Sequence, residues 1–336
     1  MIEQADDLAG LGVSSWANTV QKQADLLKPS ADDKNLIIID GNNVGYRYLK
    51  RKNFSSFSDD YIRTVESLAK SYGCKDIIVA FDYGKSEYRK AMFPEYKGNR
   101  LPPTPEEEEH FKMFFAELNS VSDAIPYQVF KLFGVEADDI ITYLTLQLKD
   151  HYPHIWIVSS DRDLYQLMTD NVSIFNLFSR KELSKKWLWD EKGLTPEEHK
   201  LSKIIQGDTG DNIRGIEGIG EKRGEDLAKT YKTISNLLSK LPLPGKSQYI
   251  RNLNAGKDLL LRNEKLINLT GHIREIIGFG TNGENNLLAL NQFCDDIRKT
   301  YPKYKIDKVE LKGQKEMTMM HLSKLDKMTD TEEKPK

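Results

Sequence analysis

The sequence has few cysteines and no long apolar run, and both absences narrow the classes of protein it can encode. Its 336 residues include only two cysteines, Cys74 and Cys294, too few for a disulfide framework or a zinc site of four thiolates. No apolar stretch approaches the roughly 18 residues of a membrane-spanning helix. The first residues, MIEQADDLAGLGVSSW, lack the basic start and apolar core of a secretory signal. We therefore expect a cytoplasmic protein with reduced thiols and no membrane partner.

A strong excess of either charge is also absent. The chain has 49 lysines and arginines against 51 aspartates and glutamates, which gives a net charge of -2. This balance neither indicates nor excludes nucleic acid as a partner, so the local pattern of charge has to decide. With 39% hydrophobic and 30% charged residues, the composition is that of a globular protein with one large domain or two modest ones.

Three short apolar runs predict the core of the fold. They cover residues 36–39, 77–81 and 155–158, and each is rich in β-branched or aromatic side chains. Such runs are typical of strands that are buried on both faces, as in a parallel sheet. Helical periodicity lies between them, at 61–72 and 135–148. The alternation predicts an α/β fold with a mostly parallel sheet flanked by helices.

Composition also suggests how the chain is divided. Residues 1–34 are polar and indicate an N-terminal extension, and residues 35–180 hold the predicted sheet. Residues 181–295 are mostly helical in pattern, with glycine-rich turns. Residues 296–336 are basic and end in TDTEEKPK, which predicts a partly disordered tail.

Aspartates follow each of the three predicted strands. Asp40 ends the first run, Asp82 the second, and Asp161 and Asp163 follow the third. One aspartate after a strand is commonly a turn or helix cap, but independent capping is a poor explanation for three strands together. Because ligands of open α/β sheets bind at the carboxyl ends of the strands, these four acids are expected at one edge.

Five more acids occur in two other segments. Glu136, Asp138 and Asp139 begin a predicted helix, where interaction with the helix dipole is the simpler explanation. Asp208 and Asp211 lie in the glycine-rich turn GDTGDN. If all nine carboxylates converge, cations are needed to offset their repulsion, since two like charges 4 Å apart repel by about 4 kcal/mol at an effective dielectric constant of about 20.

The predicted ligands are all oxygen atoms, which favour Mg²⁺, with Mn²⁺ as a substitute, over zinc. Nine acids are too many for one ion. Two ions about 3.5–4 Å apart are the usual arrangement for phosphodiester hydrolysis. The sequence therefore predicts a site with two divalent ions at the edge of the sheet.

A basic segment with interleaved tyrosines lies between the second strand and Glu136. It includes Lys85 and the sequence YKGNR, which places Tyr96, Lys97 and Arg100 close together. Lysine and arginine can stabilise charge on a cleaved phosphate, and tyrosine can stack on a base. A solvated loop would have the same composition, so this assignment is a hypothesis.

The segment IRGIEGIGEKRGEDLA has the pattern of a helix-hairpin-helix turn around Gly218 and Gly220. Glycines allow a phosphate to approach the backbone, and the N-terminus of the next helix offers N–H donors beside Lys222 and Arg223. Such contacts position a duplex without reading its sequence. A P-loop is excluded, because Glu221 stands where that motif has lysine.

Taken in order, seven segments of the chain resemble those of the 5′-nuclease superfamily, most closely the bacteriophage flap endonucleases (5′–3′ exonucleases) of the T-five type. These segments are IIIDGNNVGYR, SLAKSY, YKGNR, GVEADD, SSDRD, GDTGDNIRGIEGIGEKRG and LPLPGK. The resemblance covers about residues 35–270 and implies a PIN-like sheet, a helix-three-turn-helix module and an arch at about 84–125. Between Arg100 and Glu136 that arch is short and acidic for a phage member.

The resemblance implies metal-dependent hydrolysis of DNA near a free 5′ end, at flaps, nicks or ends, in replication or repair. It divides the metal-binding acids into two groups. The first has Asp40, Asp82, Glu136 and Asp138, and the second has Asp161, Asp163, Asp208 and Asp211. Asp139 is also counted among the metal-binding acids. It makes Lys97, Arg100 and Asp163 catalytic.

The resemblance also implies DNA contacts outside the acidic site. It gives Tyr96 a stacking role and a potassium-assisted duplex contact to the turn at Gly218–Gly220. Arg47 and Lys246 are further expected contacts to DNA. We expect a monomer, and an RNA–DNA hybrid is a secondary substrate to consider.

Two other functions remain open from the sequence. The first is a non-catalytic DNA-binding protein that uses the hairpin alone, although such a protein gains nothing from nine converging acids. The second is a PIN-type ribonuclease, although the hairpin and YKGNR favour the ends of a DNA duplex.

Overall fold

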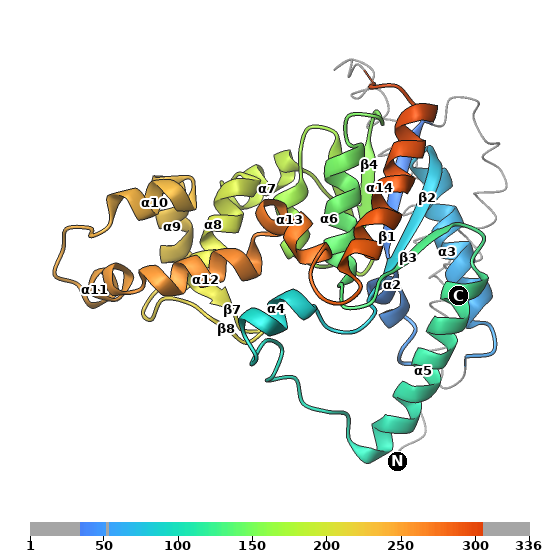
Figure 1. Cartoon of the computed structure of the whole chain (residues 1–336), viewed down its shortest axis with the longest axis horizontal. Coiled ribbons are helices and arrows are strands. Elements are labelled where there is room, and N and C mark those ends of the chain that lie inside the picture. The colour runs from blue at the N-terminus through green and yellow to red at the C-terminus, as the bar shows by residue number, and fades with distance from the viewer. Residues whose placement is uncertain (1–33, 52–53, 305–336) are drawn as a thin grey trace, which may run out of the picture.

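A six-stranded sheet organises the chain in the computed structural model, which describes residues 34–51 and 54–304 (Figure 1). The strand order is β3-β2-β1-β4-β5-β6, parallel except that β6 runs antiparallel to β5. The strands are β1 (Asn35–Asp40), β2 (Cys74–Phe81), β3 (Gln128–Lys131), β4 (Ile155–Val158), β5 (Val172–Asn176) and β6 (Lys181–Leu183). The predicted α/β class with a mostly parallel sheet is confirmed. Residues 1–33 of the expected extension (1–34) and residues 305–336 of the expected tail (296–336) lie outside the described residues.

The three predicted strands are the neighbours at the centre of the sheet. All six residues of β1 are buried, and Ile38 pairs in register with Ile78 of β2 and Ile157 of β4. A strand covered on both faces has no solvent side, which explains its continuous apolar sequence. Because the chain passes from β1 outward to β3 and then returns to β4, the sheet has a switch point between β1 and β4, where ligands of such sheets bind.

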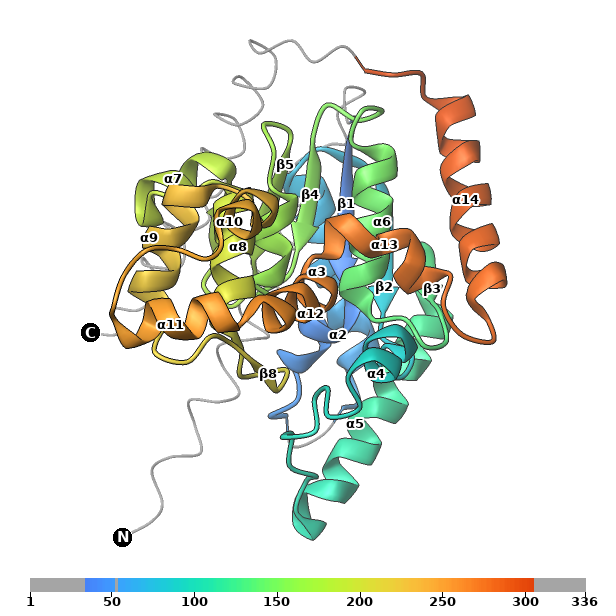
Figure 2. The ribbon, with the colours of Figure 1, turned by 60° about the vertical axis from the view of Figure 1, so that its left-hand side comes forward.

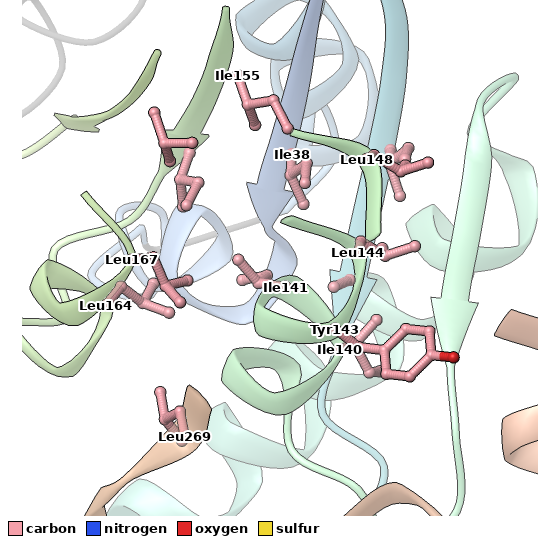
Figure 3. Packing of buried hydrophobic residues seen from close by; sticks show 14 of the residues in the cluster. Ile38, Ile140, Ile141, Tyr143, Leu144, Leu148, Ile155, Leu164, Leu167 and Leu269 are labelled. Atoms are coloured by element: carbon pink, nitrogen blue, oxygen red, sulfur yellow. The ribbon is translucent and has the colours of Figure 1, made fainter. Parts of the chain in front are cut away.

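Helices cover both faces of the sheet. Helix α3 (Phe57–Ser71) and the end of α5 (Pro105–Ala124) pack on one face through residues such as Val65 and Phe114. Helix α6 (Ala137–Leu148) covers the other face, where Ile141 and Leu144 pack with Ile38 (Figure 3). Full burial of each such side chain contributes about 1.5–3 kcal/mol.

A second helical region extends from the β5–β6 side of the sheet (Figures 1 and 2). Its own hydrophobic cluster includes Ile204, Ile205 and Leu260. Its helices are α7 (Lys185–Lys192), α8 (Pro196–Gln206), α9 (Glu221–Tyr231), α10 (Ile234–Lys240), α11 (Gln248–Ala255) and α12 (Lys257–Ile267). The sequence gives α8 a well-defined start, since Thr195 and Glu198 form a capping box and Pro196 is the first helical residue.

The last two helices return to the sheet. Leu269 and Ile273 of α13 (Leu269–Ile277) and Leu290 of α14 (Gly283–Thr300) join the hydrophobic cluster around α6. Helix α14 runs past residue 295, where we expected the tail to begin. The division at residue 180 stays a prediction, and β6 beyond it belongs to the sheet. No helix within the described residues is long and apolar enough to cross a membrane.

Candidate active site

Asp40 and Asp82 lie at the carboxyl ends of the neighbouring strands β1 and β2. Asp40 caps the short helix α2 (Gly41–Tyr46), where its Oδ1 accepts from the Asn43 backbone N–H at 3.1 Å, and its Oδ2 accepts from the Ser159 hydroxyl at 2.7 Å. Asp82 Oδ1 accepts from the Ala137 backbone N–H at 2.7 Å. The carboxylates are thus hydrogen-bonded to the residue that follows β4 and to the first residue of α6, beside the segments 161–163 and 136–139, which hold five of the other predicted acids.

Burial raises the pKa of Asp40 to about 7, and the neighbouring charge of Asp82 adds to the effect. Burial also raises the pKa of Asp82. Two desolvated carboxylates side by side are unfavourable unless a cation or protons offset their charge. The carboxyl ends of β1 and β2 therefore favour the binding of a positive ion.

Glu136, Asp138 and Asp139 form an acidic cluster at the start of α6, with oxygen atoms within 4.8 Å of one another. Asp139 is fully buried and accepts from both terminal nitrogens of Arg89, at 2.8 and 2.7 Å. Arg89 itself is only 2% exposed. Breaking such a buried pair typically costs about 3–5 kcal/mol. Asp139 therefore anchors α6 to α4 (Glu87–Met92), and Arg89 also donates to Glu136 Oε2 at 3.2 Å.

Lys97 and Tyr96 contact the same acids. The Lys97 ammonium lies 2.6 Å from Glu136 Oε1, and the Tyr96 hydroxyl lies 2.8 Å from Glu136 Oε2. Burial works to raise the pKa of Glu136, but Lys97 and Arg89 outweigh it and lower that pKa. Tyr96 is only 1% exposed, so its ring is covered in this conformation, and its stacking role stays a prediction. Its ring is part of the hydrophobic cluster of the helical region.

The YKGNR segment is bound directly to the GDTGDN turn. The Lys97 backbone N–H donates to the Asp211 carbonyl at 3.0 Å, and the Asn99 side chain donates to the Thr209 carbonyl at 2.6 Å. The Arg100 guanidinium donates to Asp211 Oδ1 at 2.9 Å. Lys97 adopts a left-handed backbone conformation, with φ of 55°. The predicted cations and the predicted acids of the turn therefore form one unit.

A lysine side chain that the sequence analysis did not single out, Lys203, bridges two acids of the second group. The Lys203 ammonium, on α8, contacts Asp163 Oδ1 and lies 2.7 Å from Asp208 Oδ2. Burial raises the pKa of Asp163 to about 6 despite this lysine. Asp161 accepts from the Asp163 backbone N–H at 2.8 Å through its Oδ1. Helical spacing alone cannot show which face of α8 carries Lys203 toward the acids.

The two groups of acids open onto one small cleft. Asp138 lines it from the first group, and Asp163, Asp208 and Asp211 line it from the second. Its acidic lining consists of carboxylate oxygens, the donors that hard divalent cations prefer. The residues therefore fit a site for divalent metal ions, with Asp40 and Asp82 at the strand ends beside it.

The arch predicted at about 84–125 consists of α4, an irregular stretch and α5. Thr104 and Glu107 form a capping box that begins α5, and Leu101 in the preceding linker is 91% exposed. The acidic first turn of α5 is exposed, as expected for its glutamates. Lys85 is also exposed, whereas Arg47 donates to the Leu177 carbonyl at 3.1 Å and is partly buried.

The predicted hairpin joins α8 and α9. Gly218 has a φ of 81°, and Gly220 caps α9, whose first turn carries the exposed Lys222 and Arg223. The Arg223 guanidinium donates to the Gly218 carbonyl at 2.8 Å. Lys246 is exposed in the loop before α11. A potassium ion at this turn stays a prediction.

The comparisons with known proteins agree with this site. A family profile described as the 5′-3′ exonuclease, N-terminal resolvase-like domain matches residues 35–195. The flap endonuclease of Escherichia phage T5 is 38% identical over 290 residues, which cover 84% of this chain and 97% of that relative. The chain belongs to the flap endonuclease and 5′–3′ exonuclease family. A 5′-3′ exonuclease of Buchnera aphidicola is 31% identical over 222 residues, 63% of this chain and 76% of that relative.

Solved structures of the phage T5 enzyme have the same fold as this 5′ nuclease. The T5 D15 protein co-crystallised with metal ions has a TM-score of 0.72 and 37% identity, over 79% of this chain and 99% of that one. A T5 D15 flap endonuclease complex with DNA and metal ions has a TM-score of 0.73 and 36% identity, over 79% and 98%. The expected PIN-like fold and membership of the nuclease family are confirmed.

Proposed function

We propose that this nuclease hydrolyses phosphodiester bonds of DNA near a free 5′ end, at flaps, nicks and ends, with two divalent ions, Mg²⁺ or Mn²⁺. The observation that carries the proposal is the cleft onto which Asp138, Asp163, Asp208 and Asp211 open, next to the contacts of Lys97 with Glu136 and of Arg100 with Asp211. A replication or repair role and RNA–DNA hybrids as secondary substrates belong to the same proposal.

Two groups of residues would hold the ions. Asp40, Asp82, Glu136 and Asp138 would serve one, and Asp161, Asp163, Asp208 and Asp211 the other. Bound Mg²⁺ ions supply an activated water and neutralise charge on the phosphate. Mg²⁺ prefers oxygen ligands, and the acids that line the cleft offer carboxylate oxygens.

The cations of this chain would act on the phosphate itself. Lys97 is held by its backbone and by Glu136, so its ammonium is positioned before the substrate arrives. Arg100 is more than half exposed and can leave Asp211 for a phosphate oxygen. A positioned donor of this kind is commonly responsible for about 10²–10³-fold of the rate.

The α8–α9 hairpin would hold the duplex. Backbone N–H groups at the start of α9, together with Lys222 and Arg223, are suited to a phosphate of one strand. The proposal has three further parts. A potassium ion would bind near Gly218–Gly220, Lys246 and Arg47 would contact the DNA backbone, and the protein would act as a monomer.

Cleavage of a 5′-labelled flap oligonucleotide tests the function. We expect a short 5′ product with Mg²⁺, no product with a chelator, and no cut in a matched 3′ flap. Tight binding without cleavage would instead support a DNA-binding module. Preference for an all-RNA substrate would support a ribonuclease.

A further inference from the structure

We propose that Tyr83 and Phe133 form a base-stacking subsite for the single-stranded 5′ arm of the substrate. The proposal rests on the function above, since it needs DNA in the acidic cleft. We call these two residues and Lys131 the aromatic platform. Tyr83 begins the basic segment whose tyrosines the sequence suggests for base stacking, whereas Lys131 and Phe133 were not singled out from the sequence.

The two rings of the platform are presented to solvent. Tyr83 is 49% and Phe133 is 47% exposed, and their ring centres are 5.5 Å apart at an interplanar angle of 84°. A half-exposed pair of aromatic rings in edge-to-face contact leaves flat surface available for a third ring. Base–aromatic stacking uses such surface with little dependence on sequence.

The backbone fixes the platform to the metal-binding acids. Tyr83 directly follows Asp82, and Phe133 lies three residues before Glu136. The Gly134 N–H donates to the Tyr83 carbonyl at 2.9 Å, which ties these two segments together. Since consecutive Cα atoms are about 3.8 Å apart, the rings lie within the span of a few nucleotides from the acids.

Positive charge beside the rings matches a nucleic-acid strand. The Lys131 ammonium lies 5.6 Å from the centre of the Tyr83 ring and donates to the Asn119 side chain of α5 at 2.6 Å. Exposed Lys85 follows Tyr83 by two residues, and no described atom lies within 4 Å of the position that a Cβ of Gly84 would take. Aromatic rings and lysines around an open backbone are the combination that binds single strands.

The position of the platform selects the single-stranded arm over the duplex. Phe133 follows β3 at one edge of the sheet, whereas the α8–α9 hairpin lies on the other side of β1 (Figures 1 and 2). A duplex on the hairpin would reach the acids from one side. The platform is on the opposite side, where the strand beyond the cleaved phosphate would pass.

The rings are not needed to hold their loop. The Phe133 carbonyl accepts from the Asn286 side chain at 3.1 Å, and Tyr83 is held through backbone bonds to Gly134 and Val135. The side chains can therefore be truncated without removing these contacts. This makes the proposal testable by substitution.

The test compares the Tyr83→Ala/Phe133→Ala double variant with a matched Trp189→Ala control, which removes an aromatic residue of 56% exposure on α7. Binding to a 5′-flap duplex and to the same nicked duplex without a flap is measured by fluorescence anisotropy with Ca²⁺. We expect the double variant to bind the flap about 5- to 100-fold more weakly and the nicked duplex within twofold of wild type. Trp189→Ala should bind both substrates as wild type does.

Two further measurements keep the outcomes distinct. The single variant Tyr83→Trp, which keeps an aromatic ring at this position, should bind the flap as wild type does. The quenching of 2-aminopurine fluorescence that the wild-type protein causes in the flap should be lost in the double variant. Equal losses on both substrates, or no loss, would overturn the subsite. If wild-type protein cuts the 5′ flap with Mg²⁺ in that case, the proposed function stands and only the platform fails. If wild type does not cut, the proposed function itself fails.

Discussion

Replacing Lys203 by alanine should increase the affinity of the acidic cleft for a divalent cation. The Lys203 ammonium contacts Asp163 and lies 2.7 Å from Asp208 Oδ2, so a metal ion that takes these oxygens has to displace it. In Lys203→Ala the ion meets two carboxylates that have no competing cation. The metal-free variant should also be less stable, because the two acids lose their partner.

The size of the effect follows from the exposure of the three side chains. They are 21%, 19% and 22% exposed, so solvent screens their interaction only in part. A hydrogen bond to a charged group contributes about 1.5–3 kcal/mol when well formed, and we take about 1–2 kcal/mol for this partly exposed arrangement. Since about 1.4 kcal/mol is a factor of ten, the variant should bind the ion about 5- to 30-fold more tightly.

Titration of Mn²⁺ into the protein, followed by calorimetry and by electron paramagnetic resonance, measures this affinity without any reaction. Burial raises the pKa of Asp163 to about 6, and loss of Lys203 raises it further, so the titration is made at about pH 8.5. Lys192→Ala is the matched control, because Lys192 contacts Glu221 at 2.7 Å and Glu225 at 3.1 Å outside the cleft. Unchanged or weaker Mn²⁺ binding by Lys203→Ala would refute the reasoning.

Four other predictions concern the same molecule. Asp163→Asn should abolish flap cleavage at saturating Mg²⁺ while the circular dichroism spectrum stays that of wild type; cleavage at the wild-type rate would contradict the site. Lys97→Ala should lower kcat by about 10²–10³-fold but change flap binding with Ca²⁺ by no more than a few fold, and equal losses would reduce it to a binding residue. The raised pKa of Asp40, about 7, means that the folded, metal-free protein binds a proton more tightly than the unfolded chain, so this group lowers stability as pH rises from about 4 to 7. In chelator, Asp40→Asn should therefore melt at a higher temperature than wild type at pH 8, with a much smaller difference near pH 4.5; an equal difference at both values would be inconsistent with this cause. Ile38→Ala should cost about 2–5 kcal/mol of unfolding free energy in urea, whereas Leu288→Ala, at a site 67% exposed, should cost less than about 0.5 kcal/mol.

The sequence was sufficient for the central strands and for the acids that follow them. Residues of β1, β2 and β4 are apolar on both faces, so their runs stand out from helical patterns. The edge strands β3 and β6 were not predicted. They have four and three residues and only partial burial, so their sequences are no different from those of loops.

Side-chain partners inside the site could not be predicted in the same way. The sequence identifies Tyr96 and Asp139 as polar residues near other functional groups. It does not show that Tyr96 is buried in the hydrophobic cluster of the helical region, or that Asp139 is bound by Arg89. Lys203 is one of several lysines in its segment. Which of them reaches an acid depends on how α8 packs, and this is a property of the tertiary structure.

The bonds between YKGNR and the GDTGDN turn have a consequence for how the arch can vary. Asn99 and Arg100 are anchored to the turn, and the exposed linker to α5 begins at Leu101. Residues inserted after Leu101 would lengthen the arch without displacing Lys97, because the anchors lie on the near side of the insertion. The length of the segment between Arg100 and α5 and the position of the Lys97 ammonium are thus separate variables, so segments of different size can be exchanged at this point without moving Lys97.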